Sequence, residues 1–101
     1  MLHNFIRGCQ TGDIDEVRRI LSDSSFDPNE LGECGRVDKK NQPILSSGFY
    51  EACRNGHTEI VTLLLQDSRI EVNKENNHGF TGFMYASYNG HREIVTSLLQ
   101  D

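Results

Sequence analysis

The chain has 101 residues, and its 15 acidic and 10 basic side chains give a formal net charge of −5. A single domain of this size has little room for a buried catalytic cavity, and a negative charge opposes the counterion release that supplies most nucleic-acid affinity. No apolar run approaches the roughly 20 residues that span a bilayer, so neither nucleic acid nor membrane is expected as a partner.

Three segments share one pattern along the chain. They are residues 5–21 (FIRGCQTGDIDEVRRIL), 47–67 (SGFYEACRNGHTEIVTLLLQD) and 81–101 (TGFMYASYNGHREIVTSLLQD). The last two are identical at most positions and lie 34 residues apart, whereas the first aligns with the second at a spacing of 44. A period in this range predicts stacked repeats of about 1–29, 47–73 and 74–101, with an insertion at about 30–46.

The first repeat is predicted to cover one end of the stack. Terminal repeats need a polar outer face, and this segment supplies one through Asp13, Asp15, Arg18, Arg19 and Asp23. The other end differs, because Val95, Leu98 and Leu99 are followed by no polar capping helix before Asp101. We expect the chain to continue beyond Asp101 or to self-associate through this uncapped repeat.

The insertion contains Gly32, Gly35 and Pro43, which argue against a helix. Two interpretations remain open. The segment is either an enlarged finger that makes a private contact with one partner, or a mobile expansion that the fold tolerates because loop closure costs little free energy. Cys34, within the insertion, is the only thiol expected to be exposed.

Each repeat is predicted to form two short helices separated at a glycine, for example residues 83–89 and 92–100 around Gly90. Apolar side chains recur in the second helix at helical period, and a left-handed glycine ends the first helix without strain. Helices this short depend on packing against neighbouring repeats.

Two features suggest chemistry but have structural explanations. His57 and His91 each open an H-x-E sequence, yet the P-C-x-x-C of zinc deaminases is missing, so these histidines are expected to bond backbone groups of a neighbouring repeat. Cys9, Cys53 and Ser87 fill equivalent positions where small buried residues are expected. The odd number of cysteines and the missing C-x-x-C spacing predict a reducing cytoplasmic setting, with the nucleus as the alternative. We expect no enzyme activity, metal or cofactor.

These repeats resemble the ankyrin family. The resemblance rests on the sequence G-H-x-E-I-V-x-x-L-L at 56–65 and 90–99. Residues 70–73 (IEVN) stand in the position of the family's A-D-V-N motif, and residues 79–83 (GFTGF) stand in the position of its G-x-T-P-L motif. It implies an all-α solenoid of helix-turn-helix units joined by β-hairpin-like loops, with a concave face that binds a protein partner. Gly48 and Gly82 depart from the family's proline, and Tyr50 and Met84 depart from its histidine.

Candidate partner-binding residues lie on the first helix of each repeat, in pairs spaced i, i+3 that share a face. They are Arg7 and Gln10, Glu51 and Arg54, and Tyr85 and Tyr88, joined by His78 and Phe80 of the adjacent finger. Aromatic side chains are enriched at interaction hot spots, so the Tyr85, Tyr88, Phe80 and His78 group is the first candidate. Alternatively, Phe80 is partly buried, the tyrosines merely cover their helix, and Glu51 and Arg54 form a surface ion pair.

Two functional classes follow. The chain is either an adaptor, scaffold or inhibitor that acts by binding alone, or the N-terminal docking or regulatory domain of a longer protein whose effector part lies beyond Asp101.

Overall fold

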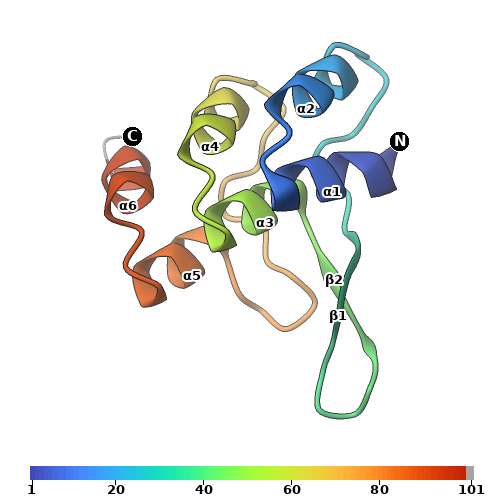
Figure 1. The fold of residues 1–101 in the computed structure, drawn as a ribbon, viewed down its shortest axis with the longest axis vertical. Helices are drawn as coiled ribbons and strands as arrows, with labels where there is room; N and C mark the ends of the chain where they lie inside the picture. The colour runs from blue at the N-terminus through green and yellow to red at the C-terminus, as the bar shows by residue number, and fades with distance from the viewer. Residues whose placement is uncertain (100–101) are drawn as a thin grey trace.

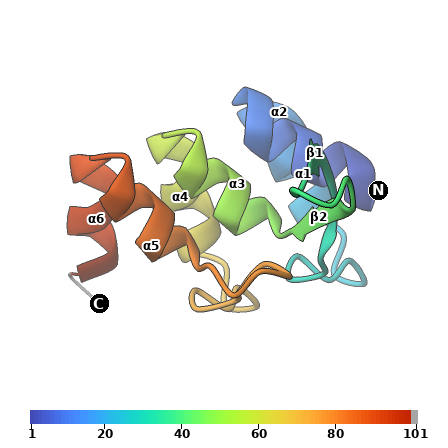
Figure 2. The ribbon, with the colours of Figure 1, turned by 90° about the horizontal axis from the view of Figure 1, so that it is seen from below.

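The computed structural model describes residues 1–99 as three pairs of helices and one β-hairpin. The elements are α1 (Leu2–Thr11), α2 (Ile14–Leu21), β1 (Gly32–Val37), β2 (Pro43–Ser46), α3 (Gly48–Arg54), α4 (Thr58–Leu65), α5 (Gly82–Tyr88) and α6 (Arg92–Leu99). The first helices α1, α3 and α5 pack side by side in one layer, and α2, α4 and α6 form a second layer beside it (Figures 1 and 2).

The core lies between the two helical layers. Each repeat contributes apolar side chains that are almost fully buried, among them Phe5 and Ile20, Ile60 and Leu64, and Ile94. Burying a side chain of this size stabilises the fold by about 1.5–3 kcal/mol. Within each layer, the main contacts join helices of neighbouring repeats: α1 with α3 and α3 with α5 in one layer, and α2 with α4 and α4 with α6 in the other. This burial therefore depends on stacking and not on any single helix pair.

The glycine junctions are confirmed. Gly12, Gly56 and Gly90 have φ of 86°, 72° and 71°, the left-handed conformation that ends the first helix of each pair. The helices expected at 83–89 and 92–100 are α5 and α6, and Gln100 lies outside the described residues. Side-chain oxygens cap the first residues of α2, α3 and α5; in α3, for example, Ser47 Oγ accepts the Tyr50 N–H at 3.0 Å.

Gly48 and Gly82 occupy points where successive first helices approach most closely. A Cβ atom on Gly82 would lie 2.8 Å from Sγ of Cys53, and one on Gly48 would collide with the ring of Phe5. A larger residue at either position would force the helices apart. This explains physically why glycine stands where the family prefers proline.

Polar contacts tie each repeat to the next. Nε2 of His57 lies 2.8 Å from the Gln10 carbonyl oxygen, and Nε2 of His91 lies 3.1 Å from that of Arg54. A carbonyl only accepts, so each imidazole donates from Nε2. The prediction that these histidines bond backbone groups of a neighbouring repeat is confirmed.

Arg69 makes a second connection, which the sequence did not indicate. Its guanidinium donates to three carbonyl oxygens of the first repeat and to the Asp67 carboxylate of its own repeat. The carbonyls are those of Leu21 at 2.7 Å, Phe26 at 3.0 Å and Asp23 at 3.1 Å. The pKa of Asp67 is held below its usual range chiefly by the hydrogen bond from Arg69.

The all-α expectation is incomplete, because the insertion contains a two-stranded antiparallel sheet. Strands β1 and β2 pair Gly32 with Ser46 and Val37 with Pro43, and the hairpin projects away from the helices (Figure 1). Its turn is ordered by Asp38, whose carboxylate accepts the N–H groups of Lys40 and Gln42 at 2.8 and 2.9 Å. The insertion therefore has the form of the enlarged finger.

Candidate functional site

A groove of about 630 Å³ lies between the hairpin, the segment 76–80 and the helices α3 and α5. Its lining is mainly apolar. Val37 and Ile44 come from the hairpin, Phe80 comes from the segment 76–80, called the second finger below, and Tyr50, Met84, Tyr85 and Tyr88 come from the helices. The remaining lining residues are Arg36, Arg54, Asn76 and His78. Its volume falls within the range of about 300–1,000 Å³ typical of ligand sites.

Three tyrosine rings form a connected series along the groove. The ring centroids of Tyr50 and Tyr85 are 5.7 Å apart at an interplanar angle of 71°, and those of Tyr85 and Tyr88 are 6.1 Å apart at 65°. The guanidinium carbon of Arg54 lies 5.1 Å from the Tyr85 centroid. Edge-to-face and cation–π contacts of this kind hold the rings in defined orientations.

The structure brings Tyr85, Tyr88, Phe80 and His78 to this one groove. Tyr88 is 85% exposed and Phe80 is 50% exposed, so neither is covered by the rest of the described chain. Arg54 also lines the groove, beside Tyr85. The role of these residues in partner binding stays a prediction.

The second finger is held against the hairpin by two hydrogen bonds of Asn77, one through its side chain and one through its backbone. Leu45 of β2 donates its N–H to Oδ1 of Asn77 at 2.9 Å, and the Asn77 N–H donates back to the Leu45 carbonyl at 3.1 Å. The carboxamide of Asn76 accepts the N–H groups of His78 and Phe80 at 2.9 and 3.0 Å. These bonds place Phe80 opposite the hairpin wall of the groove.

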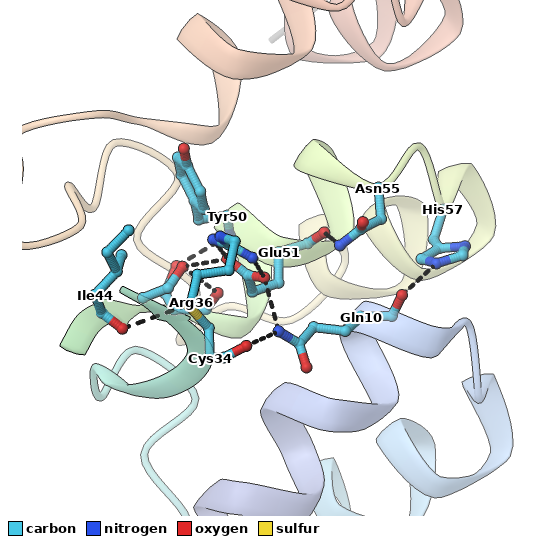
Figure 3. A network of polar contacts seen from close by, with 10 residues as sticks. Gln10, Cys34, Arg36, Ile44, Tyr50, Glu51, Asn55 and His57 are labelled. Atoms are coloured by element: carbon cyan, nitrogen blue, oxygen red, sulfur yellow. Dashed lines mark hydrogen bonds and ion pairs between the residues drawn. The ribbon is translucent and has the colours of Figure 1, made fainter. Parts of the chain in front are cut away.

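Glu51 is not a surface residue, which corrects the prediction that it binds a partner or pairs with Arg54. It is 0% exposed, and Arg36 of β1 donates to its two carboxylate oxygens at 2.7 and 2.8 Å. Ser46 and Gln10 donate to it as well, at 2.7 and 3.0 Å (Figure 3). Burial alone would raise the pKa of Glu51, but these hydrogen bonds outweigh it and the pKa is lowered.

Gln10 and Arg7 do not line the groove. The Gln10 amide is engaged in holding the hairpin, since its Nε2 donates to the Cys34 carbonyl at 2.6 Å as well as to Glu51. Arg7 is exposed on α1. Of the three helix pairs expected to bind a partner, only Arg54 and the two tyrosines of α5 therefore lie at the groove.

Tyr50 is a groove residue that the sequence analysis did not propose. It is 3% exposed, and in Figure 3 its hydroxyl points away from the Glu51 network. No hydrogen bond joins that hydroxyl to another residue in 1–99, and because no buried side-chain oxygen in this range lacks a partner, the hydroxyl reaches solvent. Burial raises the pKa of Tyr50 to about 12, with the neighbouring Tyr85 adding to the effect, so it remains a donor at neutral pH. A usable signal existed, because Tyr50 and Met84 both replace the family's histidine and both line the groove.

The thiols have structural surroundings. Cys34 was expected to be exposed, but its side chain is buried, with only 8% of its surface exposed. Its Sγ donates to the carbonyl of Ile44 on the partner strand at 3.3 Å. Cys9 and Cys53 are fully buried as expected, and burial raises the pKa of Cys53 to about 12. Ser87, at the equivalent position of the third repeat, is exposed, which is contrary to expectation.

Within residues 1–99, no group of three His, Cys, Asp or Glu side chains is arranged to hold a metal ion. None of the helices described is long and apolar enough to cross a bilayer.

Comparison with known families agrees with the repeat pattern. The family model described as ankyrin repeats matches residues 5–101 in three copies. No curated protein sequence matches the chain significantly.

Proposed function

We propose, since this chain belongs to the ankyrin repeat family, that it is a protein–protein interaction module whose concave groove binds a protein partner. Ankyrin repeats are generally interaction modules and are typically not catalytic. The observation that carries the proposal is the open groove, where exposed Tyr88 and Phe80 face an apolar hairpin wall. The proposed role is that of an adaptor, scaffold or inhibitor in the cytoplasm or the nucleus.

The energetics support binding at this position. Large aromatic side chains dominate interface energies, and those held in place before binding lose little conformational entropy on association. Tyr85 is held between Tyr50, Tyr88 and Arg54, and Phe80 is fixed by the turn at Asn76. A partner therefore meets a surface that is already ordered.

Affinity capture from native cells tests the proposal with three proteins: wild type, Tyr88→Ala and Phe83→Ala. Phe83 is an exposed aromatic on the same helix that does not line the groove, so it is a matched control. We expect partners captured by wild type and Phe83→Ala to be lost with Tyr88→Ala, while circular dichroism shows all three folded. Equal capture by Tyr88→Ala and wild type would contradict binding in the groove.

A second surface supports a second candidate. Val61 and Leu64 of the second repeat are fully buried, whereas their equivalents Val95 and Leu98 are only partly buried and Leu99 is 69% exposed. This uncovered face would suit a following repeat of a longer docking or regulatory protein, or a second copy of the chain.

Two measurements separate these occupants. Fusing one consensus ankyrin repeat after Asp101 is expected to raise the Tm, because it would cover the apolar face; an unchanged Tm argues against a following repeat. Sedimentation velocity over a range of concentrations tests self-association, which Leu99→Glu is expected to abolish. A wild-type chain that remains monomeric at every concentration rules out the second copy.

A further inference from the structure

We infer that the groove takes a peptide segment of a protein partner in which apolar side chains lie at the centre and acidic side chains lie on both flanks. This inference rests on the proposed function and specifies the partner's chemistry. It is carried by the distribution of charge around the groove: an apolar centre, an arginine without an acidic partner at one end, and two lysines at the other.

The centre of the groove has no free acidic side chain. Among its lining residues none is Asp or Glu, and the nearby Glu51 is neutralised by the two hydrogen bonds from Arg36. Val37 and Ile44 face Phe80 and Tyr88 across an apolar space. Apolar side chains would enter this space without burying a free carboxylate.

Arg54 is the uncompensated charge at the helix end of the groove. It lies over the ring of Tyr85, and no carboxylate among residues 1–99 forms an ion pair with it. The ring orients the guanidinium while leaving its N–H donors available. A carboxylate on the partner would complete both the charge and the hydrogen bonding of Arg54.

The hairpin end of the groove is cationic as well. A second depression of about 520 Å³ shares Val37, Ile44 and His78 with the groove and is lined at its outer side by Lys39 and Lys40. Asp38 is the acid in this region, and it is already engaged by two backbone N–H groups and by His78 at 3.5 Å. Its charge therefore offsets only part of the two lysines.

This local charge is opposite in sign to the chain as a whole, which carries −5. A partner that is acidic throughout would be repelled by the rest of the surface, whereas a short acidic and apolar segment meets cations only at the groove. The Tyr50 hydroxyl, which reaches solvent at the groove, adds one donor for an acceptor on the partner. The groove therefore favours a peptide with acidic side chains and hydrogen-bond acceptors, and it disfavours a basic or a purely apolar ligand.

Synthetic peptide pools are the probe for this proposal. Each fluorescein-labelled peptide has about twelve residues, roughly 40 Å when extended, which is enough to span the longest extent of the chain, 36 Å. The central positions are drawn from Leu, Ile, Phe and Tyr in all pools. The flanks are Asp and Glu in the first pool, Ser and Asn in the second, and Lys and Arg in the third. Fluorescence anisotropy gives the Kd for each pool.

The acidic pool is expected to bind most tightly, and its binding is expected to weaken at high salt because the flanking contacts are charged. Tyr88→Ala should weaken binding by about 30-fold, the loss typical of an aromatic hot spot. Arg54→Gln should weaken binding by about 10-fold. The double variant Lys39→Gln/Lys40→Gln should weaken it by about 3-fold, because the two lysines are more exposed to solvent than Arg54 and their contacts are weaker. Arg92→Gln, which makes the same charge change on α6 outside the groove, is the matched control and should leave Kd within about 2-fold.

The outcomes distinguish this inference from the proposed function. If the neutral pool binds as tightly as the acidic pool and Tyr88→Ala still abolishes binding, the charge assignment is wrong while the groove remains a binding site. If no pool binds, or Arg92→Gln weakens binding as much as Arg54→Gln, the inference is overturned. A concentration-dependent dimer that Tyr88→Ala disrupts would identify a second copy as the occupant and overturn it as well.

Discussion

Arg36 on strand β1 donates to both carboxylate oxygens of Glu51 on helix α3, at 2.7 and 2.8 Å, and so joins the inserted hairpin to the stacked helices. Glu51 is 0% exposed, so its charge has no access to water. The same carboxylate accepts from Ser46 at the base of β2 and from Gln10 of the first repeat. One buried side chain thus fixes the hairpin wall of the groove.

Arg36→Met is expected to destabilise the chain by about 3–5 kcal/mol, because it leaves the Glu51 carboxylate buried without its cation. Urea denaturation, monitored by circular dichroism, measures this loss of unfolding free energy. Arg19→Met is the control, since the pair between Arg19 and Glu16 lies at the surface, where ion pairs contribute little to stability. Similar losses in the two variants would show that the Glu51 ion pair has no special role.

Acid is expected to weaken the fold through Glu51. Its pKa is lower in the folded chain than in the unfolded chain, so the unfolded chain binds more protons and stability increases with pH in this range. The contribution is complete above the ordinary glutamate pKa of about 4.3 and is lost as pH falls through the lower folded value. Urea midpoints measured from about pH 6 to pH 3 should therefore fall more steeply for wild type than for Glu51→Gln. Parallel curves would contradict this linkage.

Arg69→Lys is expected to destabilise the chain by about 1–3 kcal/mol although it keeps the charge. A single ammonium cannot donate at once to the Leu21, Asp23 and Phe26 carbonyls that the guanidinium reaches. Amide hydrogen exchange should rise in the segment 21–26 before other segments are affected. Arg92→Lys, at an exposed position, should change neither quantity; unaltered exchange in Arg69→Lys would argue against the connection.

Gly82→Ala is expected to cost about 1–3 kcal/mol, since the new methyl group would lie 2.8 Å from Sγ of Cys53. Adding Cys53→Ala removes that sulfur, so the double variant should be less destabilised than the sum of the two single variants. Chemical denaturation of all four proteins provides the cycle. Strict additivity would mean that α3 and α5 move apart at no cost.

The repeated part of the fold could be predicted from the sequence. The helix pairs and the left-handed glycines recur at equivalent positions of all three copies, and the inter-repeat histidines in two of them, so each copy supports the interpretation of the others. The aromatic group at Tyr85 and Tyr88 followed from its spacing on one helix face.

The mispredictions of Glu51 and Cys34 depend on the insertion, which occurs once, whereas the exposure of Ser87 does not. Glu51 and Arg54 have the spacing of a surface ion pair, and only the folded hairpin reveals that Arg36, 15 residues earlier in the chain, binds Glu51 instead. Cys34 was expected to be exposed within the insertion, whereas strand pairing encloses its side chain. Contacts between a unique segment and a repeat leave no periodic signal.

The hairpin is anchored to the helices by residues of both strands and is ordered at its tip by its own residues. The anchor consists of Arg36 and Ser46 on Glu51, whereas the turn closes on the Asp38 carboxylate, with His78 3.5 Å away. Replacing residues 39–41 would therefore leave the packed helices unchanged while altering what borders the groove. At the tip, the side chains of Lys39 and Lys40 border the groove without anchoring the hairpin, so a library randomised at these two positions would vary the proposed binding surface on a constant scaffold.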